Sequence, residues 1–405
     1  MTVSTSYTVP GNRSVMPARR KWRDFLRIWW RELDKGLLLL ILLLMAFGTV
    51  AVAAASPAAA DQAIRKGETI GDFHYFYRHI VFQLTGIVGM LGVSMLDRES
   101  ARRLGILAFG VMLFLLFLVP FIGVERNGAK RWLELGMSLQ PSEFLKPGFA
   151  IMLAWVLSWR LRDRNLPVVA FASAIMALIA GLLMLQPNLG ATILFGGVWL
   201  VLILLAGISI QRIGILMGSG IVGLTAAYFL YDNARHRIDS FLGGGTAFDQ
   251  VDLASRTLLA GGWTGSGLWL GIRKNNLPEA YTDYIFSVIG EEFGLLMCGV
   301  VVLLYLAIVV KALLRVFDED NMFAMLAGAG LIANIGGQAF INILVNLQLF
   351  PSKGMTLPLV SYGGSSTWAI CFTVGLLLAI TRRNPFLARE SSGLKDYFER
   401  KEDRA

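Results

Sequence analysis

The chain has 405 residues, of which 55% are hydrophobic and 16% charged, and its mean hydropathy is +0.61. Soluble proteins carry about 25% charged residues, so this composition excludes an ordinary water-soluble enzyme. The two cysteines, Cys298 and Cys371, both lie in apolar runs, which excludes a disulfide scaffold. The net charge of +9 indicates an anionic partner only if it gathers on one exposed face.

The hydropathy pattern predicts ten membrane spans. About 20 apolar residues are needed to cross a bilayer as a helix, and the chain contains ten apolar runs. They lie at 36–56, 76–96, 104–123, 144–158, 168–185, 189–206, 213–231, 284–310, 322–345 and 367–380. The predicted fold is therefore an all-α polytopic membrane protein, with a ten-helix membrane domain over residues 36–380.

The distribution of charge between alternate loops gives the orientation of these spans. If the N-terminus is cytoplasmic, the segments on that side hold 24 of the 37 Lys and Arg residues, whereas the 28 acidic residues divide evenly. This distribution follows the positive-inside rule, so both tails, 1–35 and 381–405, are predicted to be cytoplasmic. The net charge then reports topology. Because the sequence has no base-reading motif either, nucleic acid is not an expected partner.

The N-terminal tail contains a predicted amphipathic helix. Its apolar residues recur at helical spacing between arginines: Trp22, Phe25, Leu26, Trp29 and Trp30. This pattern is typical of a helix that lies on the inner membrane surface. We expect the helix to contact membrane lipid and to anchor the tail.

Three outer segments are too irregular to be spans. Residues 124–140 and 232–283 are polar, rich in glycine and too long for simple turns, and long structured loops are often functional. The third segment, 350–365, contains Pro and Gly residues that forbid a continuous helix. Backbone of this kind near a membrane must be buried in protein or line a watery cavity.

Asp283 stands at the outer entrance of the eighth predicted span. Two interpretations are open for this position. Thr282 or Asp283 can be the N-cap of the following helix, where a side-chain oxygen accepts a backbone N–H. A carboxylate at an apolar boundary can instead act as a general base.

Two further polar groups lie inside predicted spans. Glu291 and Glu292 are adjacent acids, which normally face a cavity or a partner, so they are paired with a buried cation or carry a proton. The ninth span carries amides at a spacing of four: Asn334, Gln338, Asn342 and Asn346. Such a stripe either joins helices or lines a cavity.

Lysines beside the spans predict an anion pocket. Lys146 and Lys353 each lie among small or apolar neighbours, where an unpaired ammonium is costly. Together they indicate a pocket for phosphate or diphosphate. The sequence contains no metal-ligand cluster, nucleotide-binding loop or serine-triad pattern.

Four motifs carry a resemblance to a known family. They are AKRW at 129–132, QPSEFLK at 140–146, YTDYIF at 281–286 followed by EEFG at 291–294, and PLVSYGGSS at 358–366. With these motifs the chain resembles the SEDS family, the shape, elongation, division and sporulation proteins, from the first span to the tenth. PSKG at 351–354 is more similar to the division members than to the elongation members.

The resemblance implies a peptidoglycan glycosyltransferase that polymerises lipid II, the undecaprenyl-diphosphate disaccharide pentapeptide. The reaction is expected on the outer face of the cytoplasmic (inner) membrane, at the division septum, as an inverting transfer with Asp283 as catalytic base. No cofactor is evident, and a divalent cation, Mg or Mn, at the diphosphate stays open. The implied partners are a class B penicillin-binding protein of the FtsI type and division proteins of the FtsQ, FtsL, FtsB and FtsN types.

The polar residues expected to bind substrate surround Asp283 in these motifs and loops: Arg131, Glu143, Lys146, Lys353, Ser361, Lys274, Arg237, Gln338 and Asn342. Of these, Arg131, Lys146 and Lys353 would hold the diphosphate. The chain departs from the family pattern at two positions. Asn188 stands where Asp is usual, and Tyr281 stands where His is common.

Two other functions stay open at this level. A lipid flippase or transporter agrees with the ten spans and with Glu291 and Glu292, although the sequence lacks the internal repeat of many transporters. A non-catalytic scaffold of the division complex is the second alternative. It predicts that changes at Asp283 leave division intact.

Overall fold

The computed structural model describes residues 18–126, 129–134, 136, 138–161, 166–207, 250–351 and 354–382, with isolated positions between 211 and 239. The chain divides into two compact units, a large one at 35–381 and a small one formed by 1–34 and 382–405. In the small unit, α1 (Ala18–Glu32) confirms the predicted N-terminal helix. Its contact with the membrane stays a prediction.

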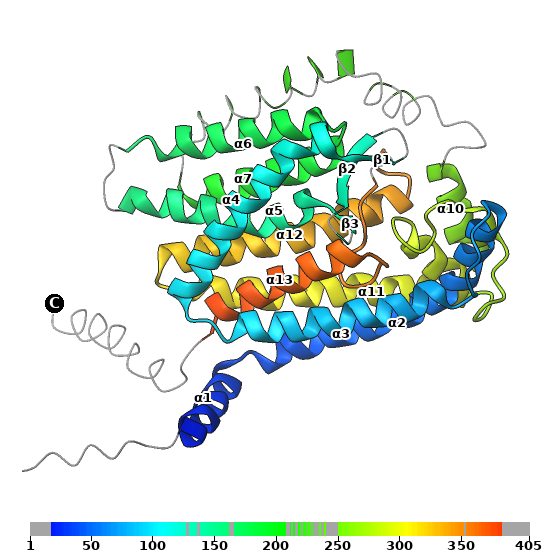
Figure 1. Cartoon of the computed structure of the whole chain (residues 1–405), viewed down its shortest axis with the longest axis horizontal. Coiled ribbons are helices and arrows are strands. Elements are labelled where there is room, and N and C mark those ends of the chain that lie inside the picture. The colour runs from blue at the N-terminus through cyan, green and yellow to red at the C-terminus, as the bar shows by residue number, and fades with distance from the viewer. Residues whose placement is uncertain are drawn as a thin grey trace, which may run out of the picture. The chain divides into compact units, whose positions relative to one another are not determined.

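Long helices dominate the large unit (Figure 1). They are α2 (Lys35–Arg65), α3 (His74–Ser94), α4 (Arg98–Ile122), α5 (Pro141–Ser158), α6 (Val168–Met184), α7 (Leu189–Leu205), α10 (Gln250–Ala260), α11 (Ile285–Phe317), α12 (Met322–Asn346) and α13 (Gly364–Ile380). Short 3-10 helices lie at η1 (Trp159–Leu161) and η2 (Arg273–Asn276). Nine of the ten predicted apolar runs coincide with helices, and the tenth, 213–231, lies largely outside the described residues.

The helices α2, α3, α4, α11 and α12 are each long and apolar enough to cross a membrane. Shorter apolar helices, α6, α7 and α13, pack among them. The chain is therefore a multi-pass membrane protein. The full number of ten crossings stays a prediction.

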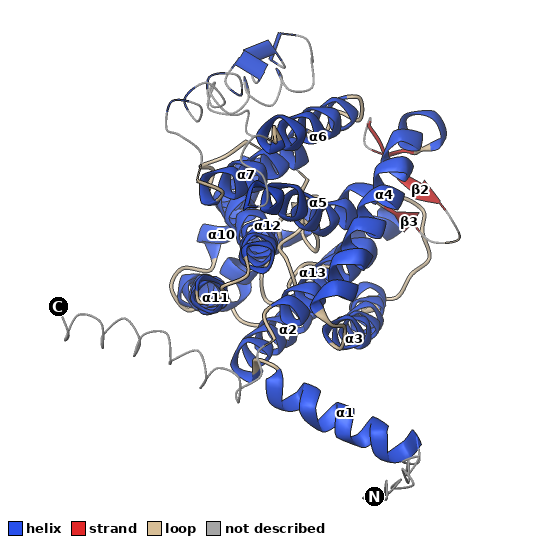
Figure 2. Ribbon diagram, turned by 90° about the vertical axis from the view of Figure 1, so that its left-hand side faces the viewer, coloured by secondary structure: helices blue, strands red, loops and turns tan. Residues whose placement is uncertain are grey.

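Helix α12 lies at the centre of the bundle and packs against α5, α7, α11 and α13 (Figure 2). A small residue permits one of these contacts. A Cβ atom on Gly330 would lie 3.0 Å from Cβ of Ala150 in α5 and 3.2 Å from Cδ1 of Leu202 in α7. Close approach at glycine is a usual source of helix association in membranes.

A small antiparallel sheet follows α4 and is an exception to the all-α architecture. Its strands are β1 (Val124–Arg126), β2 (Ala129–Glu134) and β3 (Ser138–Leu139), in the order β1-β2-β3. Val124 pairs with Trp132, and Leu133 pairs with Leu139. The strands satisfy one another's backbone groups, so the predicted outer loop has a defined shape next to α5.

The predicted cytoplasmic segments meet at one end of the bundle. Arg98, at the start of α4, donates to both carboxylate oxygens of Glu319, between α11 and α12, at 2.9 and 3.0 Å. Arg160 of η1 donates to the carbonyl of Ala206 after α7 at 2.8 Å. The sheet and the segments 261–284 and 351–363 lie at the opposite end (Figure 1). This grouping is what alternating spans require.

The segment between α12 and α13 is irregular and buried, as its Pro and Gly content predicted. Val360 and Leu357 are 0% and 1% exposed. The hydroxyl of Tyr305 in α11 donates to the carbonyl of Pro358. A Cβ atom on Gly48 in α2 would lie only 2.6 Å from Cα of Val360. Non-helical backbone at this depth is therefore satisfied within the protein.

Candidate active site

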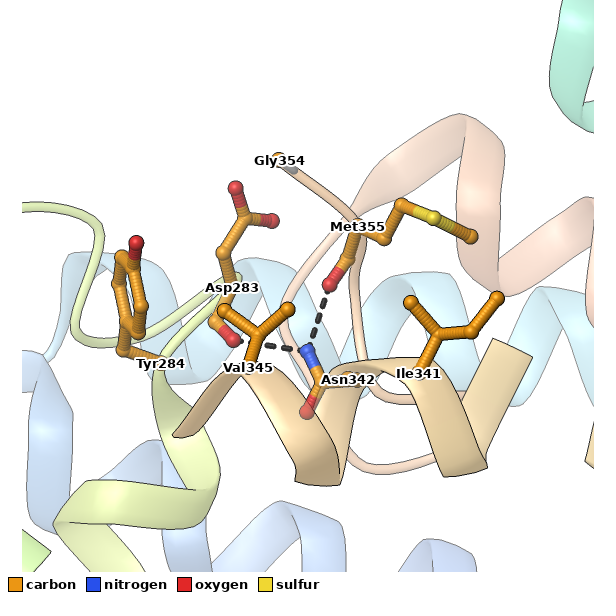
Figure 3. Close-up of a pocket in the computed structure, with 7 residues that line it drawn as sticks. All are labelled: Asp283, Tyr284, Ile341, Asn342, Val345, Gly354 and Met355. Carbon is orange, nitrogen blue, oxygen red and sulfur yellow. Dashed lines mark hydrogen bonds between the residues drawn. The ribbon is translucent and has the colours of Figure 1, made fainter. Parts of the chain in front are cut away.

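Asp283 lies in the turn that precedes α11, at the same end of the bundle as the sheet. Its backbone carbonyl accepts hydrogen bonds from Nδ2 of Asn342 at 2.8 Å and from Nδ2 of Asn346 at 3.3 Å. Its carboxylate points toward Gly354 (Figure 3). A small pocket beside it is lined by Asp283, Tyr284, Ile341, Asn342, Val345, Gly354 and Met355. Two amides of α12 thus hold the backbone of the residue whose side chain enters the pocket.

The helix-cap interpretation of Thr282 and Asp283 is wrong. The N-cap position of α11 is Tyr284, and it has no side-chain cap hydrogen bond. The hydroxyl of Thr282 instead donates to a carboxylate oxygen of Glu279 at 2.8 Å. The general-base interpretation of Asp283 therefore stays as the prediction for this position.

Arg131 on β2 lies close to Gly354, a residue that lines this pocket. A Cβ atom on Gly354 would lie 3.4 Å from Oδ2 of Asp283 and 3.8 Å from Nη1 of Arg131, so the two side chains converge on this glycine. Arg131 also donates to the carbonyls of Gln186 at 3.2 Å and Pro187 at 2.5 Å, in the turn between α6 and α7. The arginine links the sheet to this turn and brings a cation near Asp283.

Asn188 has a clear structural role in that turn. Its side-chain oxygen accepts from the backbone N–H of Ala191 at 3.3 Å, which makes it the N-cap of α7. Asn and Asp are about equally good at this position. The departure from the family's Asp therefore preserves the helix start that Arg131 contacts.

Lys146 is the centre of a second polar group. Its ammonium donates to Oε1 of Glu143 and to Oε1 of Gln338, each at 2.7 Å. Gln338 in turn donates to the carbonyl of Thr356 at 3.0 Å. The second carboxylate oxygen of Glu143 is buried and has no hydrogen-bond partner within the described ranges. The structure thus joins three predicted site residues, from α5 and α12, to the 351–363 segment.

Ser361 holds the turn of Asp283 from the other side. Its hydroxyl accepts from the backbone N–H of Leu357 at 2.8 Å and donates to the carbonyl of Thr282 at 2.5 Å. The backbone N–H of Tyr362 donates to the carbonyl of Tyr281 at 3.0 Å. These contacts explain how the 358–366 motif supports Asp283, and any contact of Ser361 with substrate stays a prediction.

The amide stripe of α12 combines both of its predicted roles. The side-chain amides of Gln338, Asn342 and Asn346 donate to carbonyls of the segments before α11 and after α12, and Asn342 also lines the pocket. Asn334 differs, because it is 1% exposed and neither amide atom has a partner in the part of the chain that the structure describes. The three outer amides therefore organise the site.

Lys274 lies in a separate buried cluster with Glu291 and Glu292. Its ammonium donates to the Glu292 carboxylate and, at 2.9 Å, to the carbonyl of Ala54 in α2. The Glu291 carboxylate accepts the backbone N–H groups of Arg273 at 2.7 Å and Lys274 at 2.9 Å. Glu292 is thus paired with a buried cation, which was one of the two interpretations, whereas Glu291 is held by backbone N–H groups. The structure does not bring Lys274 to the pocket of Asp283.

Two predicted site residues, Arg237 and Lys353, lie outside the described residues. Among the residues that are described, no group of three or more His, Cys, Asp or Glu side chains is arranged to hold a metal ion. No chemical step below is routed through a metal.

An aromatic cluster that the sequence motifs do not indicate lies beside the site. The ring of Tyr75 lies 4.4 Å from that of Tyr281 and 5.4 Å from that of Tyr362. Burial, with the nearby negative charge of Glu279, raises the pKa of Tyr281, so its phenol stays protonated where a histidine would titrate. Tyr75 belongs to no motif, so only the packing of α3 reveals it.

The chain matches the FtsW/RodA/SpoVE family, described as cell cycle protein, over residues 35–385. The chain belongs to this family. This confirms the resemblance to the SEDS proteins, which the motifs around Asp283 and the 358–366 segment carry.

Curated members of the SEDS family resemble the chain over most of its length. One from Caulobacter vibrioides is 36% identical over 368 residues, which cover 90% of this chain and 93% of that protein. Another, from Alkalilimnicola ehrlichii, is 35% identical over 376 residues, covering 89% and 91%. Both are named probable peptidoglycan glycosyltransferase FtsW.

Solved structures share the same SEDS fold. One match is a chain from a structure on the coordination of polymerization and crosslinking by a peptidoglycan synthase complex. The TM-score is 0.72 and the identity 26%, and the match covers 86% of this chain and 98% of that one. The rod shape determining protein RodA of Thermus thermophilus matches with TM-score 0.63 and 27% identity, covering 86% and 97%. The predicted helical SEDS fold is therefore confirmed.

Proposed function

We propose that this chain, a peptidoglycan glycosyltransferase of the FtsW type, polymerises lipid II by an inverting transfer with Asp283 as general base. The observation that carries the proposal is the convergence of the Asp283 carboxylate and the Arg131 guanidinium on Gly354. An acid and a cation beside one pocket provide the two elements that this reaction needs.

The chemistry follows from the linkage of the substrate. Lipid II carries an α-linked disaccharide on its diphosphate and the glycan product is β-linked, so a single displacement inverts the anomeric carbon. Asp283 takes the proton from the acceptor 4-hydroxyl as that oxygen bonds to the carbon, and the diphosphate lipid leaves. The bonds from Asn342 and Asn346 to the Asp283 carbonyl support this role, because they position the base before substrate arrives.

Cations near the base hold the diphosphate charge. Arg131 is placed by its bonds to the α6–α7 turn, and Lys146 is placed by Glu143 and Gln338. Charge-assisted hydrogen bonds of this kind stabilise the leaving group. Lys353 and Arg237, beyond the described residues, stay predicted contributors. Lys274 is assigned to support of α11 because its ammonium is bonded to Glu292 and Ala54.

The proposed setting is the inner membrane at the division septum, with both tails in the cytoplasm and the pocket on the outer face. The joining of predicted inner loops at the opposite end, through Arg98 and Glu319, supports this orientation. We further propose that the chain works with a class B penicillin-binding protein, as the similarity to a chain of a peptidoglycan synthase complex suggests. Division proteins of the FtsQ, FtsL, FtsB and FtsN types are the other proposed partners.

Among the contacts of the described residues, none favours the transport alternative. Glu291 and Glu292, which could have lined a path through the membrane, are bonded to Lys274 and to backbone N–H groups. Liposomes that receive lipid II only in the outer leaflet distinguish the functions. The polymerase proposal expects glycan chains there, whereas a flippase would move the lipid without joining sugars.

The central test is the purified Asp283→Asn protein assayed with its penicillin-binding partner on lipid II. Loss of a general base lowers rates by about 10²–10⁴-fold, so we expect glycan synthesis to fall by at least about 100-fold. The matched control is Glu279→Gln, an acid in the same turn whose carboxylate accepts the Thr282 hydroxyl. Its amide oxygen can still accept that bond, so this variant should stay active. Wild-type polymerisation by Asp283→Asn would refute the assignment.

A further inference from the structure

Residues 257–272, within the stretch that hydropathy assigns to an outer loop, comprise the end of α10 and a turn that begins at residue 261 and packs against an interruption in α11. The interruption lies at Gly294, where φ is 82° and ψ is 170°. A Cβ atom on Gly294 would lie 2.3 Å from the carbonyl of Trp263, and one on Gly265 would lie 2.2 Å from the carbonyl of Glu292. Glycines therefore let the backbone of the turn touch the backbone of the broken helix.

The turn takes up the hydrogen bonds that the break leaves unmade. In an unbroken helix, the N–H groups of residues 295 and 296 would bond to the carbonyls of residues 291 and 292. Instead they donate to the carbonyls of Gly262 and Trp263, at 2.9 and 3.2 Å. The freed carbonyls of Glu291 and Glu292 accept from the N–H groups at positions 266 and 267, at 2.8 and 3.1 Å. Such satisfaction permits irregular backbone at membrane depth.

Contacts with α2 give the depth of the turn. The ring of Phe293 lies 6.0 Å from the ring of Phe47 in α2. At ~1.5 Å per residue, Phe47 lies about 18 Å along α2 from Lys35, the first residue of that helix. The carbonyl of Trp263 accepts the backbone N–H of Leu296, three residues after Phe293. The indole N–H of Trp269 donates to the carbonyl of Ala53 at 3.1 Å, about 27 Å along α2 from Lys35. The hydrocarbon core of a bilayer is about 30 Å thick. The turn therefore extends from the outer boundary of that core into its outer half.

The exposed surface of the turn is apolar. Residues 257–272 contain no charged side chain, and Trp263, Leu270 and Ile272 are 71%, 67% and 76% exposed. Each would be costly to leave in water. On the buried side, hydrogen bonds from Lys274 to Glu291 and Glu292 hold η2, which follows the turn, against α11. A surface that is exposed and uncharged at this depth is suited to contact with lipid acyl chains.

We propose that residues 257–272 are a re-entrant segment whose exposed side contacts the acyl chains of the outer leaflet. Trp263 lies deepest, and Trp269 lies at the interface, where tryptophan is enriched in membrane proteins. The segment returns directly into the turn of Asp283, so lipid contact anchors the loop that carries this residue. Neither the proposed reaction nor the proposed partner is needed for this contact.

The test uses the whole protein in phosphatidylethanolamine–phosphatidylglycerol vesicles, with a fluorophore on single introduced cysteines. The two native cysteines are buried, which keeps background labelling low. Trp263→Cys and Leu270→Cys report on the segment. Val88→Cys on α3, 72% exposed on a span, is the lipid-facing control. Glu68→Cys, exposed in the turn between α2 and α3, is the water-facing control.

We expect doxyl-labelled lipid to quench the probes at 263 and 270 as strongly as the probe at 88, and several-fold more than the probe at 68. Quenching equal to that of Glu68→Cys at both sites, with labelling by a membrane-impermeant maleimide, would overturn the proposal. So would a loss of lipid quenching when the penicillin-binding partner is added, because a partner helix would then cover the surface. Use of both sites keeps the test decisive if one variant fails to fold.

Discussion

Two buried lysine ammonium groups have different roles in this protein. Lys146 is 3% exposed and bonds to one acid and one amide, and the second oxygen of its partner Glu143 has no partner within the described ranges. Lys274 is equally buried but bonds to Glu292 and to the α2 backbone. The first group links α5 to α12, whereas the second holds α11 against α2.

Lys146→Met is expected to remove both stability and activity. It leaves the largely buried Glu143 carboxylate without its cation, which costs about 3–5 kcal/mol. The double variant Glu143→Gln/Lys146→Met removes both charges, so its thermal stability in detergent should return toward that of the wild type. Lipid II polymerisation should stay low in both variants. Recovery of activity along with stability in the double variant would show that Lys146 is structural only.

At the scale of elements, the site depends on helices that hold irregular segments in place. The amides of α12 bind the turn before α11 and the segment after α12, and Ser361 ties these two pieces together. Helix α2 packs directly on the backbone of that second segment at Gly48. Positions far from Asp283 therefore set where its carboxylate lies.

Gly48→Ala tests this dependence. The added methyl group would meet backbone atoms of Leu359 and Val360 at 2.6–3.0 Å, and backbone cannot move aside as a side-chain end can. Overpacking of this kind costs about 1–3 kcal/mol, so thermal stability and polymerisation should both fall. The matched control is Gly89→Ala in α3, where a Cβ meets nothing within 4 Å. That substitution should be neutral or stabilising, since Ala is favoured over Gly in helices by about 1 kcal/mol. Equal behaviour of the two variants would contradict the prediction.

At the scale of the whole molecule, polar function gathers at one end of the large unit. The sheet, the turn of Asp283 and the 351–363 segment meet there, while the other end is joined by Arg98 with Glu319 and by Arg160 with the α7 terminus. This separation gives each face of the membrane a different chemistry. It places the proposed reaction at the end opposite the predicted cytoplasmic loops.

Labelling of introduced cysteines in intact spheroplasts measures this orientation. Glu68→Cys, between α2 and α3, should react with a membrane-impermeant maleimide, whereas Asp320→Cys, between α11 and α12, should react only after the membrane is permeabilised. Both positions are exposed, and the native cysteines are buried, so the signal comes from the introduced thiols. The reverse pattern would invert the proposed topology.

The motifs and the hydropathy pattern located much of the site in advance. Asp283 and Asn342, both singled out from sequence, line one pocket, and Arg131 converges with Asp283 on Gly354. Lys274 was grouped with them as a cation of the large outer loop. Its partner in the structure is Glu292, 18 residues away and next to the break in α11, which no local sequence pattern predicts.

Composition, periodicity and charge bias by themselves determined that the chain is a helical membrane protein and which residues carry polar motifs, because each of these signals is local along the chain. Only the tertiary structure decided that Asn188 caps α7, that Tyr75 stacks on Tyr281, and that the turn at 261–267 fills the break in α11. These contacts join residues distant in sequence, and their partners depend on which helices pack side by side.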